Sequence, residues 1–194
     1  NLYRKWLHTV YLQKIFKPTM STQHLSEQEI IRRQKLADLT KLGIDAYPAA
    51  LYPVTHHSAD AKTAYEADKE TKLDVCVAGR VMSINDKGKV LFLKLQDTKG
   101  IIQLYVKRDD VCPGEDKQLF DAVIKPLDLG DIIGCKGYMF TTKTGEVSVH
   151  AQEITLLCKS LKPLPVVKRD EEGNVFDEVT DPEFRYRQRY ACLL

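Results

Sequence analysis

Hydrophobic and polar residues alternate from Val90 to Arg108, and this period of two predicts two β-strands joined by a tight turn at Asp97–Gly100. One alternate set is expected to face a core, and its members are Leu91, Leu93, Leu95, Ile102, Leu104 and Val106. The other set is expected to face solvent, and its members are Phe92, Lys94, Gln103, Tyr105 and Lys107. The segment therefore predicts aromatic rings on the wet face of a sheet.

An aromatic ring and an amide among lysines are the side chains that stack on nucleic-acid bases and contact their edges. Phe92 is the candidate stacking platform on this face. The alternative is that a neighbouring segment covers Phe92, because large apolar side chains are usually buried. The alternation by itself leaves both interpretations open.

The period of two continues on both sides of this segment and predicts five strands in all. The flanking strands are expected at Val75–Ile84, Ile132–Phe140 and Glu146–Leu157, with a bend at Gly79 and a helix within Pro113–Lys125. Three meandering strands, a helix and two more strands form the order of the five-stranded OB-fold barrel, which binds oligonucleotides on its strand 2–3 face. We therefore predict an all-β core with helical additions, although a fold alone does not establish a function.

An amphipathic helix is predicted before the barrel. Ser26 and Glu29 form a capping box at its start, and Gly43 is expected to end it. Its apolar side is predicted to consist of Ile31, Leu36, Leu39 and Leu42, and its basic side of Arg32, Arg33, Lys35 and Lys41. The basic side is either a solvated surface or a face that contacts phosphates. The polar, proline-containing segment from Ala46 to Leu73 is interpreted as a connector with a helical turn near residues 61–67.

These elements divide the chain of 194 residues into four parts. Residues 1–19 are basic and aromatic, and form a leader that is either sequence upstream of a natural start at Met20 or an organelle-targeting segment. Residues 20–73 hold the helix and connector, and residues 74–160 the barrel. Residues 161–194 are interpreted as a linker and the truncated start of a catalytic domain, because a stiff Lys-Pro-Leu-Pro segment precedes a run rich in Arg and Tyr.

Composition limits the classes of function. The net charge is only +2, so any affinity for nucleic acid must come from local patches. The five cysteines are widely spaced, with no CxxC pair and no cysteine–histidine cluster, so neither a disulfide framework nor a metal site is expected. Reduced thiols indicate a cytoplasmic protein. No apolar run approaches the roughly 20 residues that cross a bilayer, so no membrane partner is expected.

Seven short motifs occur in the order found at the N-terminus of lysyl-tRNA synthetases. They are GRVMS at 79–83, LFLKLQD at 91–97, GIIQLYV at 100–106, LDLGDIIG at 127–134, KTGEVSVHA at 143–151, KPLP at 162–165 and RYRQRY at 185–190. From about Leu25 to Tyr190 the chain resembles this family, which belongs to class II, subclass b of the aminoacyl-tRNA synthetases. The resemblance implies an OB-fold anticodon-binding domain that precedes an antiparallel-sheet catalytic domain.

The resemblance also implies which residues bind tRNA. Phe92 matches the family's stacking phenylalanine, and Gln103 matches the glutamine that hydrogen-bonds a base edge. Glu146 matches an acidic residue at the start of the last strand, and Arg80 matches an arginine of the first strand. The implied partner is the anticodon loop of a lysine tRNA, with a middle uridine that subclass b shares.

Basic residues expected to contact the tRNA backbone lie in two places. Arg32 and Arg33 belong to the N-terminal helix, and Lys87 and Lys89 belong to the first hairpin. The family often carries two arginines just after the first strand, where this chain has Ile84-Asn85. The two hairpin lysines are therefore expected to supply those phosphate contacts.

The motifs of class II catalysis are absent from the sequence. It contains neither an F-R-x-E run nor a later glycine-rich motif that ends in arginine, and no Rossmann fingerprint or P-loop. We therefore assign no catalytic residue and no cofactor to this chain; ATP, Mg²⁺ and a homodimer are implied only for the full-length enzyme. The predicted function is tRNA anticodon recognition as the N-terminal part of a lysine–tRNA ligase. The alternative is a stand-alone OB-fold module that binds single-stranded nucleic acid without a catalytic role.

Overall fold

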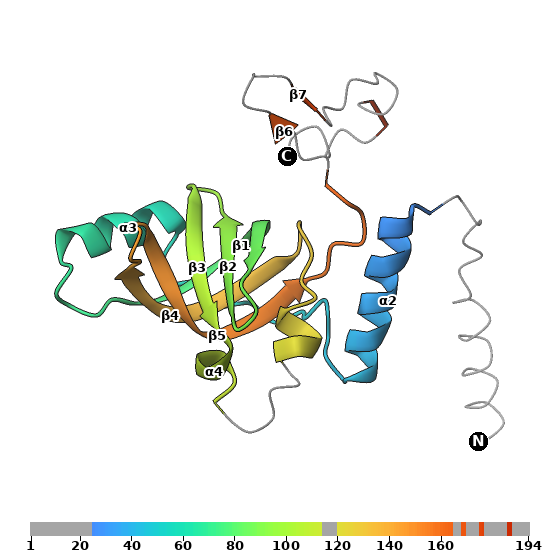
Figure 1. Cartoon of the computed structure of the whole chain (residues 1–194), viewed down its shortest axis with the longest axis horizontal. Coiled ribbons are helices and arrows are strands. Elements are labelled where there is room, and N and C mark those ends of the chain that lie inside the picture. Colours follow the sequence, from blue (N-terminus) through green and yellow to red (C-terminus); the bar gives the residue numbers. More distant parts are fainter. Residues whose placement is uncertain (1–24, 114–119, 165–167, 170–174, 177–185, 188–194) are drawn as a thin grey trace, which may run out of the picture.

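The structure is a computed structural model that describes residues 25–113, 120–164, 168–169, 175–176 and 186–187. Figure 1 shows a group of strands between two helices, α2 (Glu27–Lys41) at one end and α3 (Ser58–Ala67) at the other. The predicted leader and most of the predicted C-terminal part lie outside the described residues. None of the described helices is long and apolar enough to span a membrane.

Five strands form a closed barrel in the order β1-β2-β3-β5-β4. Their bounds are Asp74–Asp86 for β1, Val90–Gln96 for β2, Ile101–Lys107 for β3, Ile132–Thr141 for β4 and Val147–Cys158 for β5. Neighbouring strands pair antiparallel except β3 and β5, whose parallel pairing closes the barrel. The prediction of an all-β core with five strands in OB-fold order is confirmed. Outside the barrel, two short strands, β6 (Lys168–Arg169) and β7 (Val175–Phe176), pair antiparallel.

Alternate residues of β2 and β3 fill the barrel, as the period of two predicts. The side chains of this set that are at most 2% exposed are Leu91, Leu93, Leu95, Ile102, Leu104 and Val106. Burial of one such side chain stabilises the fold by about 1.5–3 kcal/mol. A one-residue slip would turn the whole set towards solvent, so this burial also determines which side chains occupy the outer face.

The connection between β3 and β4 differs from the predicted helix within Pro113–Lys125. A short helix, α4 (Arg108–Val111), follows β3 directly, and a π-helical turn, η1 (Phe120–Ile124), precedes β4. Proline disfavours helical geometry in the residue before it and lacks an N–H of its own, so α4 ends before Pro113. Residues 114–119 of the predicted helix lie outside the described residues. Phe120 is fully buried and belongs to the core of the barrel.

Helix α2 begins with the predicted capping box, in which the Glu29 amide donates to Ser26 Oγ at 3.3 Å and the Ser26 amide donates to the Glu29 carboxylate at 3.0 Å. The predicted apolar side is only partly correct, because Leu39 is buried while Ile31 is 47% exposed. The other buried residue of α2 is Arg32. Positions seven apart lie on one face of a helix, so Arg32 and Leu39 turn towards the barrel together.

Arg32 attaches α2 to the loops at one end of the barrel. Its Nη1 atom donates to the backbone carbonyls of Leu129, Ser160 and Lys162, at 3.0, 3.1 and 3.3 Å. The side chain is only 6% exposed. The sequence predicted that Arg32 contacts the tRNA backbone, but the structure directs its guanidinium at the protein's own carbonyls, and we therefore leave Arg32 out of the proposed contacts.

A buried charge cluster lies next to this attachment. Lys159 Nζ lies 2.6 Å from an oxygen of Asp128 and 2.7 Å from an oxygen of Asp131. The side chains of Lys159 and Asp131 are almost completely buried. Lys35 of α2 reaches Asp128 at 2.6 Å. Burial acts to raise the pKa of Asp128, but the hydrogen bonds from Lys159 and Lys35 outweigh it and lower that pKa below its ordinary value. The cluster therefore joins α2 to the barrel through charged groups.

Asp97 joins the β2–β3 turn to the start of α3. Its carboxylate accepts from the Ser58 amide at 2.6 Å and the Ser58 hydroxyl at 2.7 Å. It also accepts from the amides of Lys99 and Gly100, at 2.8 and 2.9 Å. Helix α3, longer than the predicted helical turn, is thereby fixed beside the strands that carry Phe92 and its neighbours.

Candidate nucleic-acid interface

A row of aromatic cross-strand partners crosses the outer face of the barrel. Phe92 on β2 pairs with Tyr105 on β3, Tyr105 with His150 on β5, and His150 with Tyr138 on β4. Their ring centroids are 5.4, 5.0 and 4.8 Å apart in that order. Phe140 lies 5.5 Å from both Tyr105 and His150. We call these five residues the aromatic ridge.

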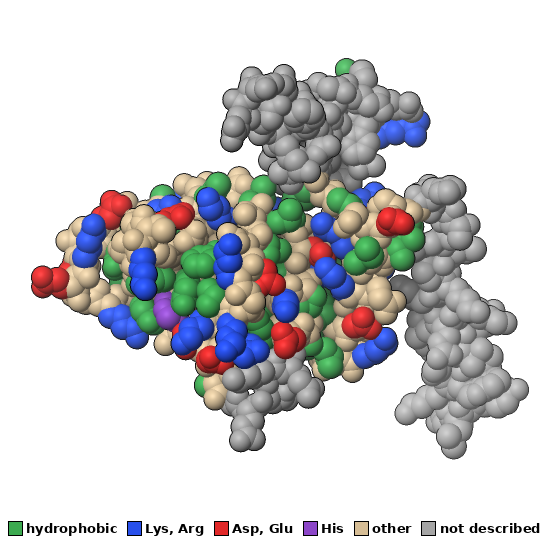
Figure 2. All heavy atoms as spheres, viewed as in Figure 1, with side chains coloured by type: hydrophobic (Ala, Val, Ile, Leu, Met, Phe, Trp, Pro, Cys, Tyr) green, Lys and Arg blue, Asp and Glu red, His purple; other side chains and the backbone are tan. Residues whose placement is uncertain are grey.

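The ridge is a surface feature. All five of its residues are half-buried, so no neighbouring segment covers Phe92 completely. Figure 2 shows hydrophobic side chains gathered over the strands of the barrel, with lysine and arginine side chains around them. Apolar rings bordered by cations suit bases that stack and phosphates that lie alongside.

Hydrogen bonds hold the ridge at its β4–β5 end. His150 Nε2 lies 2.7 Å from an Asp110 oxygen, and His150 Nδ1 lies 3.1 Å from the Tyr138 hydroxyl. Lys107 Nζ reaches the other Asp110 oxygen at 3.3 Å. Burial acts to raise the pKa of Asp110, but hydrogen bonds from His150 and Lys107 outweigh it, so the pKa is lowered and the carboxylate stays charged at neutral pH. The Lys72 ammonium lies 4.4 Å from the centre of the Tyr138 ring.

A second row of cross-strand partners runs beside the first and contains Gln103. Lys94 pairs with Gln103, Gln103 with Ser148, and Ser148 with Phe140. Gln103 Nε2 donates to Ser148 Oγ at 3.0 Å. The sequence predicted a solvent-facing Gln103. The residue does lie on the outer face, but it is only 8% exposed.

Phe92 and Gln103 are diagonal neighbours on this face. Phe92 pairs with Tyr105, two residues beyond Gln103 along β3. Diagonal pairs of this kind are about 7–8 Å apart. A base stacked on Phe92 therefore has an amide within reach of its edge.

Glu146 lies in the β4–β5 turn just before β5, and it is exposed. Its backbone is held by Thr142, whose hydroxyl and amide both donate to the Glu146 carbonyl at 3.0 Å. The Glu146 carbonyl also accepts from the Ser148 hydroxyl at 3.3 Å. The structure thus brings Glu146, Ser148 and Gln103 together in one chain of hydrogen bonds, with the Glu146 carboxylate at the surface.

Arg80 lies farther from Phe92 than the sequence suggests. It pairs with Gln96, whereas Phe92 pairs with Asn85, and four residues of β2 span roughly 13 Å. Arg80 is half-buried, and its Nη1 donates to the Gly130 carbonyl at 3.1 Å. The structure does not bring Arg80 together with the Phe92–Gln103 pair.

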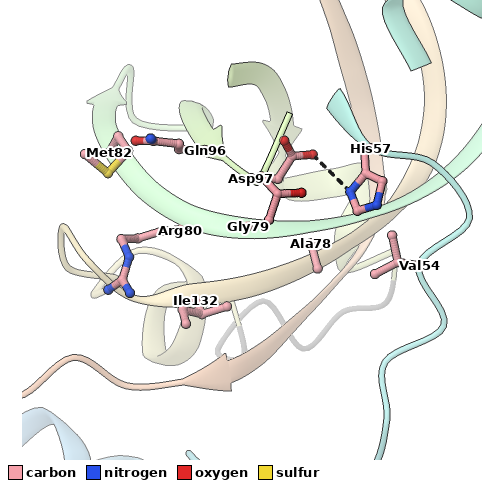
Figure 3. A pocket seen from close by; sticks show the side chains of 10 residues that line it. Val54, His57, Ala78, Gly79, Arg80, Met82, Gln96, Asp97 and Ile132 are labelled. Carbon is pink, nitrogen blue, oxygen red and sulfur yellow. Dashed lines mark ion pairs between the residues drawn. The ribbon is translucent and has the colours of Figure 1, made fainter. Parts of the chain in front are cut away.

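Arg80 instead lines an open cavity of about 410 Å³ beside β1 and β2. Figure 3 shows Arg80, Met82 and Gln96 around one side of it, and Asp97 and His57 at the other. Its volume falls within the range of roughly 300–1,000 Å³ that is common for ligand sites. The cavity forms next to Gly79, where an added Cβ would lie 2.6 Å from the Gln96 carbonyl oxygen, so the close approach of β1 and β2 requires glycine there.

The remaining predicted backbone contacts differ in exposure. Lys87 and Lys89 are exposed in the β1–β2 hairpin, and the Arg108 amide donates to the Lys89 carbonyl at 3.0 Å, which ties the hairpin to the end of β3. Arg33 is half-buried on α2. The two lysines therefore project freely, next to the strand that carries Phe92.

Four residues of this surface were missed by the sequence reasoning: Tyr138, Phe140, Ser148 and His150. The signal was available, because they occupy alternate positions of the two strands that were predicted from the period of two. The solvent-facing set was derived only for β2 and β3. Contact between these four residues and β3 depends on the parallel β3–β5 pairing, which local alternation does not show.

Comparison with known families identifies the class of domain. Residues 75–157 match the family described as tRNA anti-codon, OB-fold nucleic acid binding domain. This stretch covers the five-stranded barrel from the second residue of β1 to the last residue but one of β5. Residues 75–157 therefore belong to the tRNA anticodon-binding OB-fold domains. The description of this family names nucleic-acid binding, which agrees with the class of partner that the sequence predicts.

Relatives that match most of the chain are lysine–tRNA ligases. The protein from Porphyromonas gingivalis is 52% identical over 177 residues, which cover 90% of this chain and 30% of that protein. Those from Azobacteroides pseudotrichonymphae and Christiangramia forsetii are 51% and 49% identical, over 88% of this chain and 34% and 30% of the relatives. The chain is thus a homologue of the anticodon-binding region of lysine–tRNA ligases, as its motifs predicted, and spans about a third of their length.

Proposed function

We propose that this chain recognises the anticodon of lysine tRNA as the N-terminal part of a lysine–tRNA ligase. One observation carries the proposal: Phe92 and Gln103 are diagonal neighbours on the outer face of a barrel whose relatives are lysine–tRNA ligases. Phe92 stacks on one anticodon base, and Gln103 hydrogen-bonds the edge of that base. Stacking of a base on an aromatic side chain contributes about 1–3 kcal/mol.

Five further residues have assigned roles. The exposed Glu146 carboxylate accepts hydrogen bonds from a neighbouring base, and Arg80 contacts the RNA from the cavity beside β1 and β2. Lys87 and Lys89 contact phosphates from the hairpin at the far end of β2, and Arg33 adds a weaker contact from α2. Anticodon loops suit this arrangement because their unpaired bases can be splayed out and read on their Watson–Crick edges.

The reaction belongs to the full-length enzyme. In the proposed parent protein, a catalytic domain attaches lysine to tRNA with ATP and Mg²⁺ and forms the homodimer. Our assignment gives this chain the recognition step and no cofactor. A cytoplasmic location goes with this function, because charged tRNA is consumed there in protein synthesis.

The second candidate is a general single-strand binder built on the same barrel. The aromatic ridge alone would serve that function, because every base has a face that can stack. The hydrogen-bonded chain of Gln103, Ser148 and Glu146 favours the first proposal, since a binder without sequence preference has no need of a fixed edge-reading amide.

Competition binding separates the two candidates. The chain is titrated with a labelled stem-loop that carries a UUU anticodon. The complex is then challenged with four unlabelled ligands: the same UUU stem-loop, a stem-loop of scrambled anticodon, poly-U and poly-dT. We expect the UUU stem-loop to compete at least tenfold better than the scrambled one. Equal competition by all four ligands would support the general binder and overturn the proposed recognition.

A further inference from the structure

Ser148 is a fully buried hydroxyl on the face that the proposed function assigns to RNA. Its side chain contacts two groups at hydrogen-bond distance: Gln103 Nε2 at 3.0 Å and the Glu146 carbonyl oxygen at 3.3 Å. A serine hydroxyl has one hydrogen to donate and two lone pairs that accept. The two contacts therefore determine how that hydrogen is used.

The direction of the hydrogen bonds follows from the Glu146 carbonyl. A carbonyl oxygen only accepts, so the Ser148 hydrogen points to Glu146. Towards Gln103 the hydroxyl then offers only a lone pair, which accepts from the amide N–H. Gln103 consequently turns its Nε2 towards Ser148 on β5, and its Oε1 lies on the other side of the amide group.

This orientation matters because uracil and cytosine differ at their Watson–Crick edges. At N3 uracil donates a hydrogen bond, whereas cytosine accepts one. A glutamine that rotates freely can present either its oxygen or its nitrogen, and so can match both bases. A glutamine whose nitrogen is held on one side presents an acceptor to the base on the other side, and that acceptor matches only uracil.

We propose that Ser148 is a positioning residue that makes Gln103 select uracil over cytosine. The inference rests on the proposed function, because it takes a pyrimidine of the anticodon as the base stacked on Phe92. Ser148 need not touch the RNA. It acts by holding the amide of Gln103 in one of two orientations that otherwise have similar energy.

The test compares two anticodon stem-loops, UUU and UCU, which differ only in the middle base. Wild-type protein is expected to bind UUU at least tenfold more tightly. In Ser148→Ala the amide is released, so the ratio is expected to fall at least fivefold, with weaker binding of UUU and stronger binding of UCU. Ser148→Thr retains a hydroxyl and is expected to retain the UUU:UCU ratio. Ser148→Cys carries a thiol, which is a weaker acceptor, and is expected to lose the ratio. The cysteine variant replaces Ser148→Ala if the alanine variant does not fold.

A double-mutant cycle shows whether Ser148 acts through Gln103. In a Gln103→Ala background, Ser148→Ala is expected to leave the UUU:UCU ratio unchanged. An unchanged ratio in Ser148→Ala alone, or equal loss of affinity for both stem-loops, would overturn the positioning role while leaving the proposed function intact. Failure of the wild-type protein to prefer UUU would instead overturn the proposed function, and this inference with it.

Discussion

Phe92 and Tyr105 face each other across β2 and β3, with ring centroids 5.4 Å apart and ring planes inclined at 66°. Edge-to-face pairs of this kind contribute about 0.5–1.5 kcal/mol beyond the area that they bury. Tyr105 therefore holds the Phe92 ring in place as a preformed platform for the proposed stacking. A platform that is ordered in advance costs less conformational entropy when a base stacks on it.

Replacement of Phe92 by alanine is expected to weaken binding of the UUU stem-loop about 5- to 150-fold, because a stacked base contributes about 1–3 kcal/mol. The measurement is a fluorescence titration at fixed salt. Leu42→Ala serves as a control, since Leu42 is an exposed apolar residue that caps the C-terminus of α2, outside the ridge, and its truncation should leave affinity unchanged. Equal affinities of Phe92→Ala and wild type would remove Phe92 from the binding site.

The hairpin lysines are expected to act through salt-dependent phosphate contacts. The double variant Lys87→Ala, Lys89→Ala should lower the slope of log K against log salt, by about 0.7 for each contact with a single strand. It should also leave the preference for UUU over scrambled stem-loops unchanged. Lys41→Ala is the control, because Lys41 is exposed on α2, outside the strands that carry the aromatic ridge. A slope that does not change in the double variant would contradict the assignment.

Removal of the Lys159 ammonium is expected to destabilise the fold strongly. Lys159→Met leaves Asp128 without one partner and the fully buried Asp131 without its lysine. Removal of one member of a buried ion pair typically costs about 3–5 kcal/mol, because a buried charge is left without compensation. Urea denaturation at neutral pH gives the free energy of unfolding. Lys41→Met removes an exposed lysine of α2 and should hardly move the unfolding midpoint. Similar midpoints for the two variants would contradict a stabilising role of the buried charge cluster.

Asp97 is expected to contribute stability that is lost in acid. Burial acts to raise its pKa, but hydrogen bonds from Ser58, Lys99 and Gly100 outweigh it, so the pKa lies below the ordinary value of 3.8. The unfolded chain then takes up a proton first as the pH falls. The contribution of Asp97 is therefore fully present above about pH 4 and disappears as the pH drops through the folded-state pKa.

Unfolding free energies measured from neutral to strongly acidic pH check this expectation. The difference between wild type and Asp97→Asn should be largest at neutral pH and should shrink in acid. Asp45→Asn provides a comparison, since Asp45 is exposed and accepts from only one backbone amide, that of Tyr47. A difference between wild type and Asp97→Asn that grows as the pH falls would reverse the sign and exclude a lowered pKa.

Parts of the candidate site could be predicted because they depend on one strand at a time. The outer-face positions of Phe92, Gln103 and Tyr105 follow from period-two alternation, and the structure places all three there. The exposure of Gln103 could not be derived in this way. Gln103 is buried in the folded barrel beside Ser148, which is 45 residues away along the chain and meets Gln103 through the β3–β5 pairing.

Arg32 shows the same limit for the N-terminal helix. By composition it belongs to a basic face, and arginines on such faces usually meet solvent or phosphate. In the folded chain its Nη1 atom is bound by carbonyls of residues 129, 160 and 162. No property of the helix sequence indicates that these carbonyls converge there, because they come from loops about 100 or more residues away.

The sequence by itself determined the five strands, their inward faces, the capped helix and the motifs of the lysine–tRNA ligases. These are local properties, which follow from side-chain periodicity and short spacings. The tertiary structure alone decided that Phe92 extends into an aromatic ridge, that Gln103 hydrogen-bonds Ser148, and that Arg32 is buried. The physical reason is that closure of a barrel brings together distant strands and loops, and the register between them is set by packing of the whole core.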